Sequence, residues 1–190
     1  VGQGALNANT TASNNSAVGR YALNENTTGT ENTAMGLSAL KSNTTADYNS
    51  AFGKSALEEN TTGTQNVAVG AYALDANTTA SSNTGVGYNA LGANTTGTQN
   101  VSVGNRCLEA NTTGSQNTAV GSNSLQASTT GEENTAVGTE ALTAVTTSSY
   151  NTAVGYQASA TQTTSGQYNT TVGYQAGKAN TTGTSLVVVG

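Results

Sequence analysis

The sequence has no histidine, proline or tryptophan, and only one cysteine, one methionine and one phenylalanine among its 190 residues. Without histidine, the Ser-His-Asp triad, histidine acid–base catalysis and most zinc sites are excluded. A single cysteine, Cys107, excludes a disulfide framework within the chain. We therefore expect no catalytic residue, no metal site and no cofactor, and we do not expect the protein to be an enzyme.

Charged residues are also scarce, at 8% of the chain, with 5 basic and 10 acidic side chains and a net charge of −5. So few basic residues cannot form the positive surface that nucleic acids require. No apolar run is long enough to span a bilayer, and no signal peptide is visible. The acid pairs Glu58-Glu59 and Glu132-Glu133 occupy different places in the repeat described below, which indicates solvated surface charge rather than a carboxylate dyad.

The sequence instead contains a 17-residue unit that recurs along the chain. We number its positions from the leading asparagine, as in Asn117 to Glu133. In the consensus, positions 1 to 5 are Asn-Thr-Ala-Val-Gly, positions 8 and 9 are Ala-Leu, and positions 11 to 15 are Ala-Asn-Thr-Thr-Gly. The glycine of position 5, preceded by a bulky apolar residue, falls at Gly2, Gly19, Gly36, Gly53, Gly70, Gly87, Gly104, Gly121, Gly138, Gly155, Gly173 and Gly190.

A fixed period of this length is typical of stacked repeat architectures, in which a thin core is shared between neighbouring coils. An apolar content of 34% suits such a core. Glycine and β-branched residues at this density favour strands over helices. The sequence therefore predicts an all-β fold, a parallel β-solenoid or β-roll of about 11 coils with two short strands per coil. We expect residues 1–190 to form a single β-solenoid repeat domain.

Alternation of side chains along a strand predicts which positions face the core. Position 4 is always large and apolar, and position 9 is leucine in nearly every coil. If both point inward, the small apolar residue at position 3, as in Ala68 and Ala119, points outward. The predicted core consists of Val18, Leu23, Met35, Leu40, Phe52, Leu57, Val69, Leu74, Val86, Leu91, Val103, Leu108, Val120, Leu125, Val137 and Leu142.

The leading asparagine recurs in every full coil, and stacked asparagines can pass amide hydrogen bonds from coil to coil. This predicts a ladder of Asn15, Asn32, Asn49, Asn66, Asn83, Asn100, Asn117, Asn134, Asn151 and Asn169. The Asn-Thr-Thr words that begin at position 12 fit the N-glycosylation pattern, but we interpret them as strand-end chemistry copied with the repeat. Cys107 occupies position 8, where it replaces the usual alanine as another small residue.

Tyrosines near the turns are the candidate surface-binding residues. Tyr150, Tyr156, Tyr168 and Tyr174 occupy the last position of a coil or position 6 of the next. They could form an aromatic strip for sugars or for a neighbouring chain. The alternative is that they are amphipathic surface tyrosines flanking a turn.

Two motifs of the 17-residue unit resemble known repeats. The words Asn-Thr-Ala-Val-Gly-Tyr-Gln-Ala and Ala-Asn-Thr-Thr-Gly, as at 151–158 and 179–183, resemble the repeats of phage tail-fibre-like proteins. The Asn-x-Ala-Val-Gly core is similar to the head repeats of trimeric autotransporter adhesins, which are left-handed parallel β-rolls packed as trimers. The resemblance covers the whole chain and implies an extracellular, cell-surface or virion location.

We therefore expect a structural fibre segment, such as a tail-fibre or surface-filament shaft, taken from a longer fibre because the chain opens and closes inside a repeat. The expected partner is the chain itself, as a homotrimer about the outward alanine column, as a head-to-tail filament, or both. A glycan-binding adhesin is the alternative function. Ice binding is a third possible function. The two threonines of each repeat are adjacent, however, so only one threonine column, from Thr28 through Thr182, would be exposed.

Overall fold

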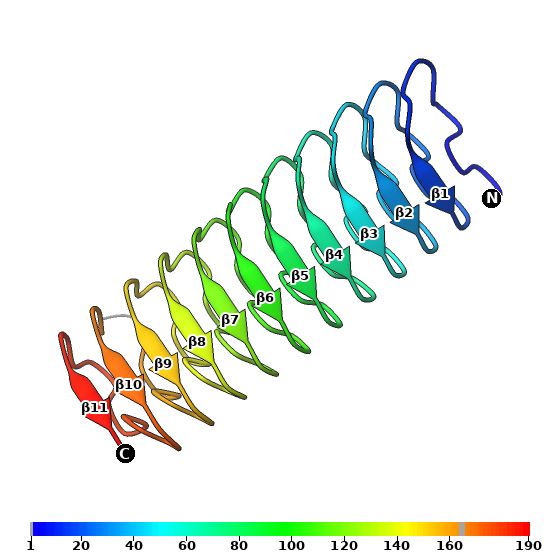
Figure 1. The fold of residues 1–190 in the computed structure, drawn as a ribbon. Helices are drawn as coiled ribbons and strands as arrows, with labels where there is room; N and C mark the ends of the chain where they lie inside the picture. Colours follow the sequence, from blue (N-terminus) through cyan, green and yellow to red (C-terminus); the bar gives the residue numbers. More distant parts are fainter. Residues whose placement is uncertain (1, 164–165) are drawn as a thin grey trace.

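The computed structural model describes residues 2–163 and 166–190, and it is an all-β parallel solenoid (Figure 1). None of the described residues is helical. Eleven short strands follow one another along a rod, and they form one sheet in sequence order. The strands are β1 (Ser16–Val18), β2 (Thr33–Met35), β3 (Ser50–Phe52), β4 (Val67–Val69), β5 (Thr84–Val86), β6 (Val101–Val103), β7 (Thr118–Val120), β8 (Thr135–Val137), β9 (Thr152–Val154), β10 (Thr170–Val172) and β11 (Val187–Val189).

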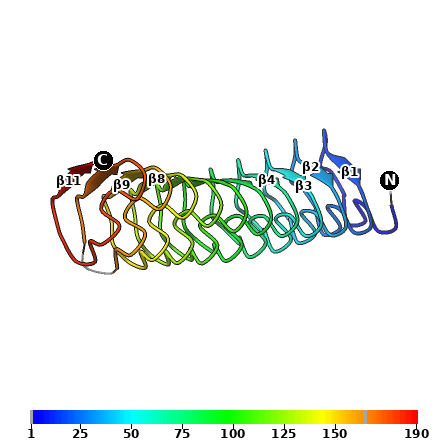
Figure 2. The same cartoon turned by 90° about the horizontal axis from the view of Figure 1, so that it is seen from below.

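Neighbouring strands pair in parallel and in register, so that equivalent residues stack into columns along the rod. Ala119 of β7 lies opposite Ala136 of β8, for example, and Val120 lies opposite Val137. Figure 2 shows the coils side by side along the rod, with the strands on one side of each coil. Side chains of the same repeat position therefore form a continuous column along the rod.

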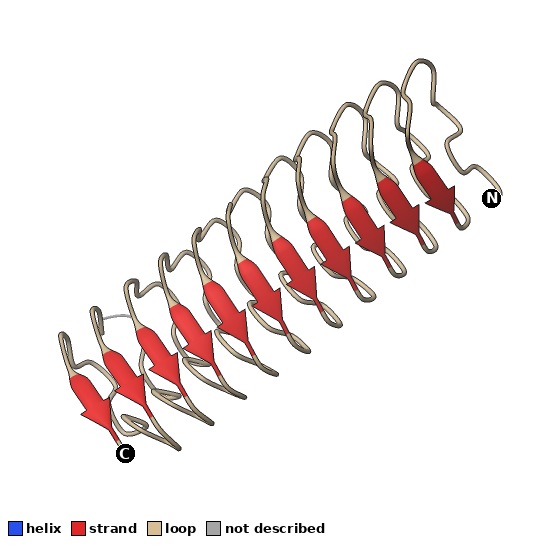
Figure 3. Ribbon diagram, viewed as in Figure 1, coloured by secondary structure: helices blue, strands red, loops and turns tan. Residues whose placement is uncertain are grey.

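The prediction of two strands per coil is wrong, because each coil contains one strand and the rest is turn (Figure 3). The expected second strand is interrupted by left-handed residues at positions 7 and 9. Asn89 and Leu91, for example, both have φ of 54°. Such residues break the extended backbone that a strand requires. The segment still bonds coil to coil, since the amide of Leu91 donates to the Cys107 carbonyl at 3.0 Å.

The prediction that position 4 points inward is also wrong. Ala119 at position 3 is completely buried, whereas Val120 at position 4 is 37% exposed. The core is built from the alanines of positions 3 and 8 and the leucine of position 9, which is completely buried as predicted in Leu23, Leu40, Leu57, Leu74, Leu91, Leu108, Leu125 and Leu142. The side chains predicted for the core that lie exposed or only half-buried on the outside are Val18, Met35, Phe52, Val69, Val86, Val103, Val120 and Val137.

The width of the coil explains this reversal. Gly85 occupies position 3, and a Cβ added to it would lie 3.1 Å from the Ala90 carbonyl oxygen and 3.3 Å from Leu74 Cγ. Beside a leucine at position 9, the interior therefore has room for little more than one carbon atom at position 3. A valine would overpack it, so the larger residue of the Ala-Val pair faces outward and the alanine fills the gap beside the leucine. The larger Thr171 lies beside Ser159 and Gly177, which replace that leucine.

The glycine of position 5 is required for two reasons. Gly121 has φ of 132°, a conformation that side chains disfavour. A Cβ there would also lie 2.5 Å from the carbonyl carbon of Gly138 in the next coil. Two successive backbones meet at this corner, and no side-chain rotation could relieve the overlap.

The predicted asparagine ladder runs through the buried interior. The backbone N–H of Asn117 donates to Asn100 Oδ1 at 3.0 Å, and the side-chain Nδ2 of Asn117 donates to the Gly131 carbonyl at 2.8 Å. Each asparagine thus binds the preceding coil and closes its own. Asn15 at the first full coil is half-buried, and the members from Asn32 to Asn169 are buried.

A second asparagine ladder, at position 12, was not predicted. Asn111 Nδ2 donates to Asn94 Oδ1 at 2.8 Å and to the Gly114 carbonyl at 3.0 Å. The same carbonyl accepts a bond from Asn100 of the first ladder, so both ladders converge on position 15. Its completely buried members are Asn26, Asn43, Asn60, Asn77, Asn94 and Asn111. These six side chains are inaccessible to glycosylation in the folded rod, which supports the structural interpretation of the Asn-Thr-Thr words.

Candidate functional site

Across residues 2–163 and 166–190 the structure contains no pocket and no cluster of side chains suited to holding a metal ion. This described part of the chain also lacks any helix with the length and apolarity needed to cross a membrane. The candidate sites are exposed surfaces of the rod. Three surfaces are candidates: the outer face of the sheet, the tyrosine pairs and a polar stripe at position 10.

The outer sheet face consists of the outward side chains of positions 2 and 4 on β1 to β11. Position 2 is serine, threonine or valine, and position 4 is valine except for Met35 and Phe52. None of these positions on the described strands carries a charge. The apolar residues that are at least 36% exposed on this face are Val18, Met35, Phe52, Val67, Val69, Val101, Val120, Val137, Val154, Val172, Val187 and Val189.

Two polar columns border the outer sheet face. Position 6 follows each strand, and Arg20 and Lys54 are its charged members. Position 17 precedes each strand, and its charged members are Glu31 and Glu133. Across the described coils, position 6 thus has no acidic residue and position 17 has no basic residue. The few charges that border the sheet face are therefore basic on the position 6 side and acidic on the position 17 side, with two residues on each side.

The four candidate tyrosines form two stacked pairs. The ring centroids of Tyr150 and Tyr168 are 5.0 Å apart with 5° between the planes, and those of Tyr156 and Tyr174 are 5.4 Å apart with 15° between the planes. Equivalent positions of successive coils therefore pair with each other, and the two pairs lie on opposite borders of β9 and β10. Stacking covers one face of each ring, although the side chains remain 41% to 70% exposed.

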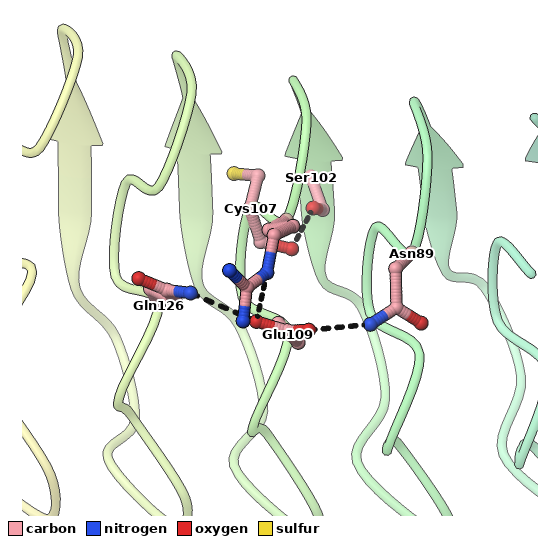
Figure 4. A network of polar contacts seen from close by, with 6 residues as sticks. Asn89, Ser102, Cys107, Glu109 and Gln126 are labelled. Carbon is pink, nitrogen blue, oxygen red and sulfur yellow. Dashed lines mark hydrogen bonds and ion pairs between the residues drawn. The ribbon is translucent and has the colours of Figure 1, made fainter.

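Position 10 carries a stripe of linked polar side chains. Glu109 accepts hydrogen bonds from Asn89 at 2.6 Å, from Gln126 at 2.8 Å and from Arg106 Nε at 2.8 Å (Figure 4). Partial burial acts to raise the pKa of Glu109, but the bonds from Gln126, Arg106 and Asn89 outweigh it and lower that pKa. Because these partners come from three successive coils and satisfy the carboxylate, this cluster braces the rod.

Cys107 lies beside this cluster, and its side chain is completely buried. Its Sγ donates to the Ala119 carbonyl at 3.2 Å, and burial raises the pKa of the thiol to about 11. In the next coil Ser124 makes the equivalent bond, from Oγ to the Ala136 carbonyl at 3.1 Å. A buried thiol that stays protonated is unreactive, so Cys107 acts as the small residue that position 8 requires.

Asp75 on the same stripe has a perturbed carboxyl group. Partial burial raises its pKa to about 6, with further increases from the nearby charges of Glu58 and Glu59. The folded chain therefore binds a proton more tightly than the unfolded chain does. Asp75 accordingly lowers stability as the pH rises from about 4 to about 6, and its full penalty applies above that range.

We expect Asp75→Asn to increase the free energy of unfolding by about 1 kcal/mol at pH 7. The gain is this small because the carboxyl group is half exposed and solvent screens its charge. At pH 4 the gain should nearly vanish, since the carboxyl is then neutral in the folded state. Urea unfolding at both values measures the difference. Glu133→Gln, at an exposed position away from the stripe, should show no such pH-dependent gain. An equal gain for Asp75→Asn at pH 4 and pH 7 would contradict the electrostatic explanation.

No protein-family model matches the chain, and neither does any curated protein or solved structure. The fold itself defines the class, a β-solenoid repeat protein built from stacked 17-residue coils. Its function is therefore inferred from the rod and its surfaces.

Proposed function

We propose that this solenoid is a structural element, a stiff shaft segment of an extracellular or virion fibre. The observation that supports this proposal is the continuity of the bonding between coils. The sheet runs without a break from β1 to β11, and the asparagine ladder of position 1 accompanies it from Asn15 to Asn169.

A third set of bonds runs beside these two. At position 13 the threonine hydroxyl donates to the carbonyl of the equivalent threonine in the next coil, as Thr95 Oγ1 does to Thr112 at 3.0 Å. Bending the rod would have to lengthen several parallel sets of hydrogen bonds together. Stiffness of this kind suits a spacer, and a spacer requires no pocket or catalytic group.

Small-angle scattering and antibody labelling test the proposal. A rod of eleven strands at about 4.8 Å spacing should have a maximum dimension of roughly 50 Å, or a multiple of that if rods join end to end. Antibodies raised against the purified rod should label filaments on intact source cells or on the virions that they release. Labelling confined to the interior of the cell would overturn the extracellular shaft.

A glycan-binding adhesin is the second candidate, and the exposed tyrosine pairs are the observation that favours it. Glycan-array binding by the parent chain that is lost in the Tyr156→Ala, Tyr174→Ala double variant would support this function. Ice binding gains no support from the paired threonines, because the position 13 hydroxyls bond to the next coil and position 14 alone stays exposed. Thermal hysteresis at micromolar protein would favour ice binding instead.

A further inference from the structure

The outer sheet face is an apolar surface that a soluble rod would be expected to cover. It extends about 50 Å along the rod and about 10 Å across the three residues of each strand, which gives about 500 Å². The face carries no charge, although most of its position 2 residues are serine or threonine, and its area is near the upper end of the patches that monomers expose. Together with the bordering columns of positions 6 and 17, it approaches the roughly 800 Å² per partner that stable protein interfaces bury.

The borders of this face indicate which partner fits it. Arg20 and Lys54 lie on the position 6 border, and Glu31 lies on the position 17 border within the same part of the rod. A second copy related by a two-fold axis parallel to the rod brings each position 6 border against the partner's position 17 border. Opposite charges then meet at similar heights. With the rods antiparallel, position 6 would instead face position 6, and the basic border would meet no acid.

The sizes of the outward side chains favour the same arrangement. With parallel rods in register, position 2 of each coil faces position 4 of the equivalent coil in the other copy. The largest outward residue, Phe52, then faces Ser50, and Met35 faces Thr33. Where position 2 is larger, as in Val67 and Val101, position 4 is an ordinary valine. In each of these layers, the position 4 side chain of one copy thus faces a position 2 side chain of equal or smaller size in the other copy.

We propose that the outer sheet face is a self-association surface at which two copies of the chain pack face to face, with their rods parallel and in register. The two sheets would lie about 10 Å apart, as in a β-sandwich. This pairing replaces the contact predicted from the sequence, because the alanine column that was to form a trimer is buried inside each coil. The pairing concerns the isolated chain, so it can fail without affecting the proposed shaft function, and the reverse also holds.

Sedimentation equilibrium of the full chain tests the surface. The parent should be a dimer at micromolar concentrations. The Val120→Lys, Val137→Lys double variant places charges in the centre of the face and should weaken association at least about 100-fold, with the thermal midpoint unchanged once both are monomeric. The matched control, Thr130→Lys with Thr147→Lys, alters the exposed position 14 of the same coils and should remain a dimer. A monomeric parent, or equal weakening by the control, would overturn the proposal.

A charge exchange tests the orientation. Arg20→Glu and Glu31→Arg should each weaken the dimer about 10-fold, and combining them should restore most of the affinity. The two residues lie on opposite borders of one chain, so such rescue requires contact between copies. Absence of rescue would overturn the parallel register. A parent mass of three chains at all concentrations would overturn two-fold pairing in favour of the trimer.

Discussion

Replacing Asn117 with aspartate is expected to lower the free energy of unfolding by on the order of 3–5 kcal/mol, although the two side chains have nearly the same shape. Asn117 is completely buried, and its Nδ2 donates to the Gly131 carbonyl at 2.8 Å and to Asn100 Oδ1 at 3.2 Å. A carboxylate can donate neither bond. It would place a negative charge against two oxygens that already carry partial negative charge.

Urea unfolding at pH 7 measures the loss, and Asn105→Asp is the matched control. Asn105 is exposed at position 6 of the preceding coil, so its substitution should change stability by less than about 0.5 kcal/mol. Burial favours the neutral form of the new carboxyl in the folded state. The loss from Asn117→Asp should therefore shrink as the pH falls toward about 4. If the two variants lost equal stability, the ladder would have no energetic role.

The features predicted correctly from the sequence are those that depend only on repetition. A constant spacing of glycine, leucine and asparagine requires equivalent residues to stack, whatever the path of the coil. The solenoid, the leucine column and the position 1 ladder follow from this. Leu91, for instance, belongs to a column that is leucine in nearly every coil, and it is completely buried.

Which of positions 3 and 4 points into the core could not be predicted from repetition alone. Alternation allows either neighbour to point inward, and hydrophobicity alone favours valine over alanine. The choice depends on the width of the coil, which is set by the left-handed turns at positions 7 and 9. At position 9 the residue is leucine, as in Leu91, which rarely adopts a positive φ, so the sequence does not indicate that turn. One signal was present: position 4 accepts Met35 and Phe52, whereas position 3 is never larger than threonine through β10.

The second ladder was missed because the Asn-Thr-Thr motif was interpreted as the end of a strand, and its asparagine was not considered as a stacked column. Its asparagine recurs at position 12 as regularly as the predicted ladder recurs at position 1 over the first coils. Regular recurrence of an amide was the reason for predicting the first ladder, and it applied equally to the second. The second ladder stops where the asparagine is replaced, at Ser128, and this interruption provides a direct test of what it contributes.

Ser128→Asn is expected to raise the free energy of unfolding by about 1–2 kcal/mol. In the present structure the Asn111 Oδ1 and Ser128 Oγ atoms are both buried without a hydrogen-bond partner. An asparagine at 128 can donate from Nδ2 to Asn111 Oδ1 and to the Gly131 carbonyl, as the regular coils do. The substitution removes one unpaired hydroxyl and satisfies one unpaired carbonyl, and it leaves a single unpaired oxygen facing the next coil.

A double-mutant cycle with Val145 separates the ladder from a general gain in packing. Val145 occupies position 12 of the next coil and is completely buried. Val145→Asn alone should be destabilising, because it replaces an apolar side chain with an amide that has no asparagine partner in the preceding coil. In the Ser128→Asn background the same change should cost about 1 kcal/mol less, since the two amides can then bond to each other. Purely additive effects in urea unfolding would show that the second ladder contributes no cooperative stability, and that the buried asparagines of position 12 serve only to close their own coils.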